Sequence, residues 1–149
     1  MTNDYLCSMP EPRIFTLEEA ERALPLVRRI VADLQTEYRA WQDAVSRYEL
    51  AADVARGDAS EPASMTELRA AVDSRAVRVE RLLRELEQIG CELKDFEVGL
   101  VDFYALLEDR LVFLCWRIDE DRISSWHELD AGYAGRQPID AALFPGTVQ

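Results

Sequence analysis

Apolar residues recur along the first third of the chain at alternating spacings of three and four residues. This heptad spacing aligns them as one seam along a helix, as in helices that pack side by side. Thr16 and Glu19 precede the seam as a capping box, in which each side chain binds the other residue's free backbone N–H. We predict a first helix over residues 16–55, with a kink or a new helix start near Pro25, because proline removes a backbone donor. The seam consists of Leu17, Ala20, Leu24, Val27, Val31, Leu34, Tyr38, Trp41, Val45, Tyr48 and Ala52.

The same spacing returns after a short polar segment. Residues 56–64 contain glycine, proline and other turn formers, which predict the tip of a helical hairpin. Ser64 and Glu67 repeat the capping-box pattern, and Gly90 suits the left-handed end of a helix. We therefore predict a second helix over residues 65–89 that folds back antiparallel on the first.

The two seams also suggest a register for the hairpin. If Ala52 faces Met65, the numbers of paired positions sum to about 117. Arg75, the one polar residue in the second seam, then lies beside Trp41, where its guanidinium could stack on the indole ring.

The helical period ends at Gly90. Residues 111–118 are a run of strand formers, residues 123–129 form a second candidate strand, and the polar turn between them favours a β-hairpin. Residues 91–94 could add a third short strand, whereas residues 101–107 suggest a helical turn or a loop. The glycine-rich residues that follow lack periodicity, so we expect a loop and a loosely held tail.

These elements predict one mainly α (α+β) domain over residues 1–149. A long antiparallel helical hairpin is followed by a small β-hairpin and a loop-rich C-terminal segment over residues 91–139. A hydrophobic content of 48% is enough for one core. The sequence has no apolar run of ~18 residues and no leader with a basic start and an apolar centre. We therefore expect no membrane span and a cytoplasmic location.

The charge of the chain is strongly negative and unevenly spread. The net charge is −12, with 29 acidic residues against 17 basic ones. Residues 64–89 carry five charges of each sign, whereas residues 90–149 carry twelve acidic residues against five basic ones. An acidic surface repels phosphate backbones and anionic lipids, so we expect neither nucleic acid nor a membrane as a partner.

The cysteines favour free thiols. Cys7, Cys91 and Cys115 are odd in number and lack the spacing of two cysteines separated by two residues. They predict neither a disulfide framework nor a cysteine-based zinc site. Cys115 lies in an acidic segment, which argues against a nucleophilic role because a reactive thiolate needs a positive environment.

His127, the only histidine, is the main candidate for chemistry. Together with Asp102 or Glu128 it could act as a general base or hold a divalent metal. On a strand, however, His127 and Glu128 point to opposite faces and cannot share one ion unless a bulge intervenes. If positions paired in the β-hairpin sum to about 241, His127 lies opposite Leu114 on an apolar face, which favours a packed histidine with one hydrogen bond. We therefore assign no metal ligands, leave the cofactor unknown, and keep His127, Glu128 and Asp102 as catalytic candidates.

Two further residues are candidates for ligand contacts. Arg136 lies between two glycines and a proline, in a loop that could bring a guanidinium and backbone N–H groups to a carboxylate or phosphate. The simpler interpretation is a structural turn in which Arg136 pairs with a nearby acidic residue. Trp126 is the second candidate because it adjoins His127.

Several strings of residues carry a family resemblance. They are Phe15-Thr16-Leu17-Glu18-Glu19-Ala20, Leu24-Pro25-Leu26, the string from Gly90 to Asp95, Gly99-Leu100-Val101-Asp102-Phe103, Leu114-Cys115-Trp116-Arg117, Trp126-His127-Glu128 and Gly135-Arg136-Gln137-Pro138. Over residues 13–139 the chain resembles the domain-of-unknown-function 2203 family of bacterial proteins. The resemblance implies a bacterial source and a fingerprint in the C-terminal segment, but no activity and no functional residues.

Two functions fit these expectations. The first is a homo-oligomerising interaction module, most simply a homodimer in which two hairpins form a four-helix bundle. Apolar residues outside the seam, such as Leu26, Ile30, Leu50 and Leu83, motivate it, and another protein could also bind the hairpin. The alternative is a small enzyme or a ligand- or metal-binding protein, with its site around His127 in the C-terminal segment.

Overall fold

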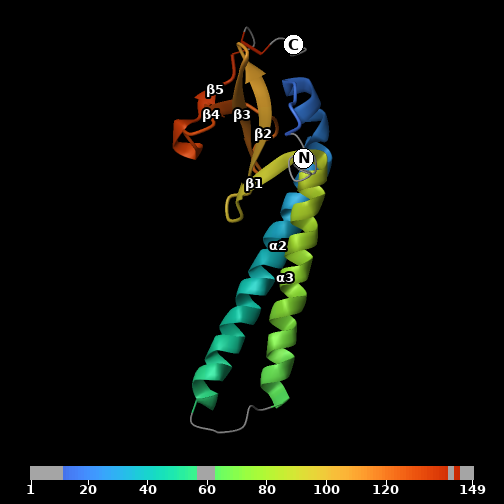
Figure 1. Ribbon diagram of the computed structural model, residues 1–149, viewed down its shortest axis with the longest axis vertical. Coiled ribbons are helices and arrows are strands. Elements are labelled where there is room, and N and C mark those ends of the chain that lie inside the picture. Colours follow the sequence, from blue (N-terminus) through green and yellow to red (C-terminus); the bar gives the residue numbers. More distant parts are fainter. Residues whose placement is uncertain (1–11, 57–62, 141–142, 145–149) are drawn as a thin grey trace, which may run out of the picture.

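The computed structural model describes residues 12–56, 63–140 and 143–144. Two long helices form a hairpin, and a five-stranded sheet lies against one end of it (Figure 1). This arrangement confirms the predicted α+β fold with its helical hairpin. The elements are α2 (Leu17–Ala55), α3 (Ala63–Ile89), β1 (Cys91–Asp95), β2 (Leu100–Leu107), β3 (Arg110–Arg117), β4 (Ser125–Glu128), the 3-10 helix η1 (Tyr133–Gly135) and β5 (Gln137–Pro138).

Helix α2 begins with the predicted capping box. The Thr16 hydroxyl accepts a hydrogen bond from the Glu19 N–H, and the Glu19 carboxylate accepts one from the Thr16 N–H, each at 3.1 Å. The helix then runs unbroken through Pro25, so the alternative of a second helix starting there is wrong. Pro25 lies on the exposed face, where water can bind the carbonyl that loses its N–H partner. The kink near Pro25 stays a prediction.

Helix α3 already includes Ala63 and Ser64, so the predicted N-terminal cap at Ser64 is wrong. Most of the predicted tip, residues 56–64, lies outside the described residues. At the other end, Gly90 has the expected positive φ, +108°. A Cβ at Gly90 would approach the Cβ of Arg13 to 2.9 Å, so both the backbone and the space favour glycine.

The two helices pack close to the expected register. The Arg69 guanidinium donates a hydrogen bond to the Tyr48 hydroxyl at 3.1 Å, and the numbers of these two positions sum to 117. Arg75 behaves differently from the expectation. Its guanidinium binds the carboxylate of Glu37 at 3.1 Å, so the expected stacking on Trp41 is wrong.

The sheet is an antiparallel meander in the order β1-β2-β3-β4-β5. Strands β1, β3 and β4 correspond to the predicted strands, but the prediction of a helical turn or loop over residues 101–107 is wrong. These residues belong to β2, which pairs with β3 over its whole length, from Leu100 opposite Arg117 to Leu107 opposite Arg110. The loop expected near the C-terminus contains η1 and the short strand β5.

The main core lies between one face of the sheet and the base of the hairpin. From α2 it takes the buried positions up to Leu34, and from α3 it takes Leu86 and its partly buried neighbours. Ile30 is buried here and Leu83 packs against this core, so neither is free for a partner as the sequence suggested. Phe144 is 3% exposed and packs against Trp126, so the expectation of a loosely held tail is wrong at this residue.

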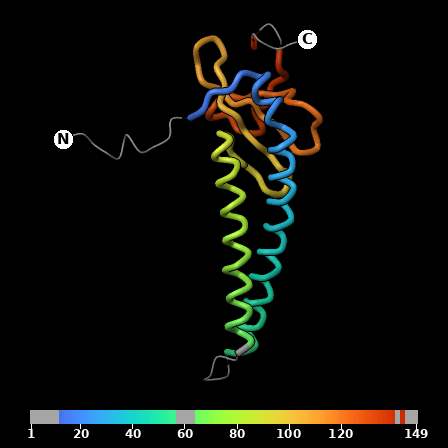
Figure 2. The backbone as a smooth tube through the Cα atoms, turned by 90° about the vertical axis from the view of Figure 1, so that its right-hand side faces the viewer, coloured from blue at the N-terminus to red at the C-terminus, as the bar shows by residue number. Residues whose placement is uncertain are grey.

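The rest of the hairpin projects away from the sheet (Figure 2). We call this part, residues 38–56 and 63–78, the distal hairpin. Among its described side chains, Ala44 and Met65 are buried, and the others are half-buried or exposed. No helix in the described ranges is long and apolar enough to cross a membrane.

Candidate functional site

A buried polar cluster lies on the sheet face that points away from the core. Because side chains alternate along a strand, Asp102 points opposite to its core neighbours Val101 and Phe103. Asp102 in β2 is paired with Cys115 in β3, and His127 in β4 lies diagonally across from Cys115. The three side chains are 3%, 0% and 2% exposed. We call them the Asp–Cys–His cluster.

Hydrogen bonds hold both ring nitrogens of His127. The Nδ1 atom lies 2.7 Å from the backbone carbonyl oxygen of Glu128, which can only accept, so Nδ1 carries a hydrogen. The Nε2 atom lies 3.2 and 3.1 Å from the two carboxylate oxygens of Asp102. One further proton is therefore shared between the imidazole and the carboxylate, and the pair is neutral overall wherever that proton resides.

The surroundings raise the pKa of both acids in the cluster. Burial raises the pKa of Asp102, against the opposing effects of the charge of His127 and of hydrogen bonds from Cys115 and His127. Burial, reinforced by the negative charge of Asp102, raises the pKa of Cys115 to about 12, although Arg136 acts in the opposite direction. At neutral pH Cys115 is thus a neutral thiol, which is a poor nucleophile.

Arg136 borders the cluster and is held by an acidic residue. Its Nη2 atom donates to Glu120 at 2.6 Å and to the backbone carbonyl of Cys115 at 3.3 Å. The Nε atom of Arg136 is buried and has no hydrogen-bond partner among the described residues. Arg136 therefore connects the turn after β3 to the backbone beside the cluster.

The structure brings together two of the five candidates from the sequence, His127 and Asp102. Glu128 points elsewhere, because its carboxylate pairs with Arg110 at 2.7 Å on an exposed part of the sheet. Hydrogen bonds from Arg110 lower the pKa of Glu128. Trp126 is 5% exposed and belongs to the core on the helix side of the sheet, away from His127.

Cys115 was not predicted from the sequence as a member of the cluster. The expected register put His127 opposite Leu114, whereas the structure pairs His127 with Phe113. A register shift of one residue moves a side chain to the other face of a sheet. The corrected register puts His127 on the face of Cys115 and Asp102. The available signal was the single acidic residue within the apolar run of β2.

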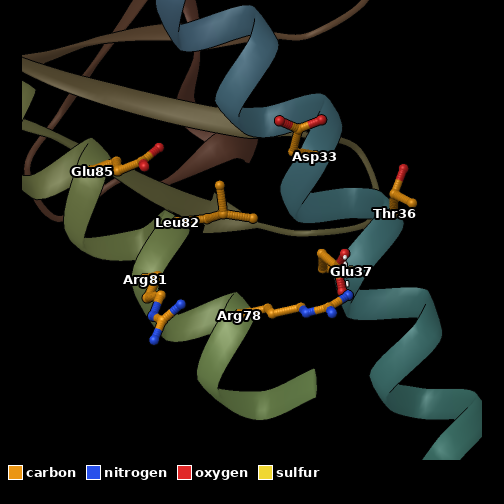
Figure 3. Close-up of a pocket in the computed structure, with 7 residues that line it drawn as sticks. All are labelled: Asp33, Thr36, Glu37, Arg78, Arg81, Leu82 and Glu85. Carbon is orange, nitrogen blue, oxygen red and sulfur yellow. Dashed lines mark ion pairs between the residues drawn. The ribbon is translucent and has the colours of Figure 1, made fainter. Parts of the chain in front are cut away.

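Two surface grooves lie along the hairpin. The first, about 400 Å³, is lined mainly by charged side chains of α2 and α3, and Arg78 pairs across it with Glu37 at 3.6 Å (Figure 3). None of its lining residues belongs to the Asp–Cys–His cluster. The second, about 580 Å³, lies in the distal hairpin and is mainly apolar. Its lining residues are Arg47, Leu50, Ala51, Val54, Ala55, Ser64, Met65 and Leu68.

Comparison with known proteins supports the family resemblance. No curated protein and no solved structure matches the chain. A family model described as an uncharacterized conserved protein (DUF2203) matches residues 13–139, a span that contains both helices of the hairpin and all five strands. The chain therefore belongs to the DUF2203 family of uncharacterised conserved proteins.

Proposed function

We propose that the protein is a homo-oligomerising interaction module, in which the distal hairpins of two chains pack into a four-helix bundle. The observation that carries this proposal is the incomplete burial of the distal seam. Trp41, Val45, Tyr48 and Val72 occupy seam positions, yet each is half-buried. Two helices alone cannot enclose a seam, whereas four can surround a common core.

The apolar groove of the distal hairpin supports the same surface as the dimer interface. Leu50 is 68% exposed and Val54 is 80% exposed, while Met65 beside them is 4% exposed. In a twofold dimer the same patch meets itself, so exposed side chains of one chain can enter the groove of the other. Burying an exposed leucine or valine stabilises a complex by about 1.5–3 kcal/mol.

Charge favours a second copy of the chain as the partner. In the distal hairpin, residues 38–56 carry three charges of each sign, and residues 63–78 carry two acidic residues against three basic ones. The whole chain has a net charge of −12, so two copies repel each other through their other surfaces. The distal hairpin is nearly neutral, and it is the part on which two copies can approach without that repulsion.

The test is the molar mass in solution, measured by sedimentation equilibrium up to tens of micromolar. We expect a dimer for the wild type and a monomer for the double variant Leu50→Arg, Val54→Arg. The matched control is Leu26→Arg, which changes an exposed leucine of α2 outside the distal hairpin and should leave the dimer intact. A monomeric wild type, or a double variant as dimeric as the control, would overturn the proposal.

A ligand-binding protein or small enzyme built around His127 is the second candidate. The convergence of His127 and Asp102 favours it. However, their side chains are 2% and 3% exposed, so the covering residues must move before a substrate can reach them. A thermal-shift screen with His127→Ala as the control tests this candidate.

A cytoplasmic location also stays part of the proposal, because free thiols such as those of Cys91 and Cys115 are typical of reducing compartments.

A further inference from the structure

We propose that Asp102, Cys115 and His127 bind one zinc ion. The three residues lie on adjacent strands, on one face of the sheet, and each can offer one ligand atom. These ligand atoms all lie within 4.8 Å of one another. The sequence argument against a metal rested on Glu128, which points to the opposite face from His127. Cys115, brought in by the corrected register, supplies a ligand on the same face.

The donor atoms select the ion. A thiolate, an imidazole nitrogen and a carboxylate oxygen are the three ligand types that zinc accepts in proteins, whereas Mg²⁺ and Ca²⁺ prefer oxygen alone. Tetrahedral zinc with ordinary bond lengths places a nitrogen and an oxygen ligand about 3.3 Å apart. The Nε2 atom of His127 lies 3.1 and 3.2 Å from the oxygens of Asp102, which is close to that spacing.

The hydrogen bond at Nδ1 orients His127 for this role. Histidine ligands usually donate their other ring N–H to a carbonyl or carboxylate, which fixes the tautomer and the ring direction. Here the Glu128 carbonyl holds Nδ1–H at 2.7 Å, so the Nε2 lone pair can point into the cluster. Arg136 binds the backbone carbonyl of Cys115 and so steadies the strand position that carries the thiol.

The charges of the cluster balance with and without the ion. Without zinc, the Cys115 thiol holds one proton, and Asp102 and His127 share another, so the cluster is neutral. Zinc binding replaces both protons, and two positive charges then meet one thiolate and one carboxylate. The net charge stays zero, so the ion adds no uncompensated charge to a buried site. A water molecule could complete the tetrahedron.

Cobalt substitution tests the site directly. Because the cluster is enclosed, the protein is unfolded with a chelator present, freed of metal and refolded with Co²⁺. We expect one ion per chain, a near-ultraviolet thiolate-to-cobalt charge-transfer band and the intense visible bands of tetrahedral cobalt. Addition of Zn²⁺ during refolding should abolish these bands and release two protons per ion at neutral pH. Failure of the wild type to bind one ion would overturn the proposal.

Variants locate the ion. Cys115→Ser should abolish the charge-transfer band and weaken zinc binding more than about 100-fold, beyond the loss typical of an outer-shell partner. Cys91→Ser is the matched control, because Cys91 is equally buried but lies outside the cluster, and it should keep the band. Asp102→Asn provides a second variant of nearly unchanged shape, which should keep the band but bind more weakly. A full band in Cys115→Ser, its loss in Cys91→Ser, or unchanged affinity in Asp102→Asn would contradict the assignment.

Discussion

The Nε2 atom of His127 lies 3.1 Å from a carboxylate oxygen of Asp102, although the two residues are 25 positions apart in the sequence. Strand β3 lies between the strands that carry them, so the contact spans three strands. Both side chains are almost fully buried. Removing either partner therefore leaves a buried polar group without its counterpart, and such a group is costly.

The first prediction concerns the coupling of this pair. In metal-free protein, Asp102→Leu and His127→Leu should each lower the free energy of unfolding by about 3 kcal/mol. The double variant should lose less than the sum of the two, because it leaves no unpaired partner. Urea denaturation measures the free energy of unfolding of the wild type, the two single variants and the double variant. Asp121→Leu, at an exposed aspartate, is the control and should change stability by less than about 0.5 kcal/mol. Strictly additive losses would contradict the coupling.

The second prediction concerns Cys91 and alkaline pH. Burial raises the pKa of Cys91 from 9.0 to about 12. Between these values the unfolded chain loses the thiol proton while the folded chain keeps it, so stability is full below pH 9 and falls as the pH rises towards 12. The expected loss from this group is about 1.4 kcal/mol per pH unit.

The measurement is the free energy of unfolding of the wild type and of Cys91→Ala as a function of pH. The comparison uses the slope and not the absolute stability, because the alanine variant also loses packing. We expect a shallower alkaline slope for Cys91→Ala. Equal slopes for the two proteins would show that Cys91 does not titrate as predicted.

The third prediction concerns Arg28, which joins α2 to the turn after β3. Its guanidinium donates to the carbonyl oxygens of Ile118 at 2.6 Å and Glu120 at 2.9 Å, and it lies 5.0 Å from the centre of a Trp116 ring. Lysine cannot reproduce this planar, two-branched contact. Arg28→Lys should therefore lower the free energy of unfolding by about 1–2 kcal/mol. The neighbouring Arg29→Lys changes an exposed side chain and should have almost no effect in thermal or urea unfolding. Equal effects of the two substitutions would refute this role.

The helical hairpin could be predicted from the sequence because its signals are local and repeated. Thr16 and Glu19 form a capping box within a single turn, and the seam repeats every seven residues. Whether Pro25 would kink the first helix or end it was harder to predict. Its consequence depends on whether the freed carbonyl faces water or the core, and that is a property of the packed structure.

The candidate site depended on long-range pairing, which local patterns do not determine. Strand β2 was missed because Asp102 interrupts its apolar run. The burial of this carboxylate can be explained only once its partners, Cys115 and His127, are known. The register of β4 was wrong by one residue, which was enough to hide Cys115 from His127. The sequence could indicate His127 and Asp102 separately, but their meeting and the third member of the cluster required the sheet.

The most direct test of the proposed function is hydrogen exchange of the wild-type protein at two concentrations, one on each side of the dimer dissociation constant. If the distal hairpins form the dimer, amide exchange in residues 38–56 and 63–78 should slow at the higher concentration, with a smaller change in β2 and β3. Exchange that is independent of concentration throughout the distal hairpin, or protection that increases mainly in the sheet, would contradict the account.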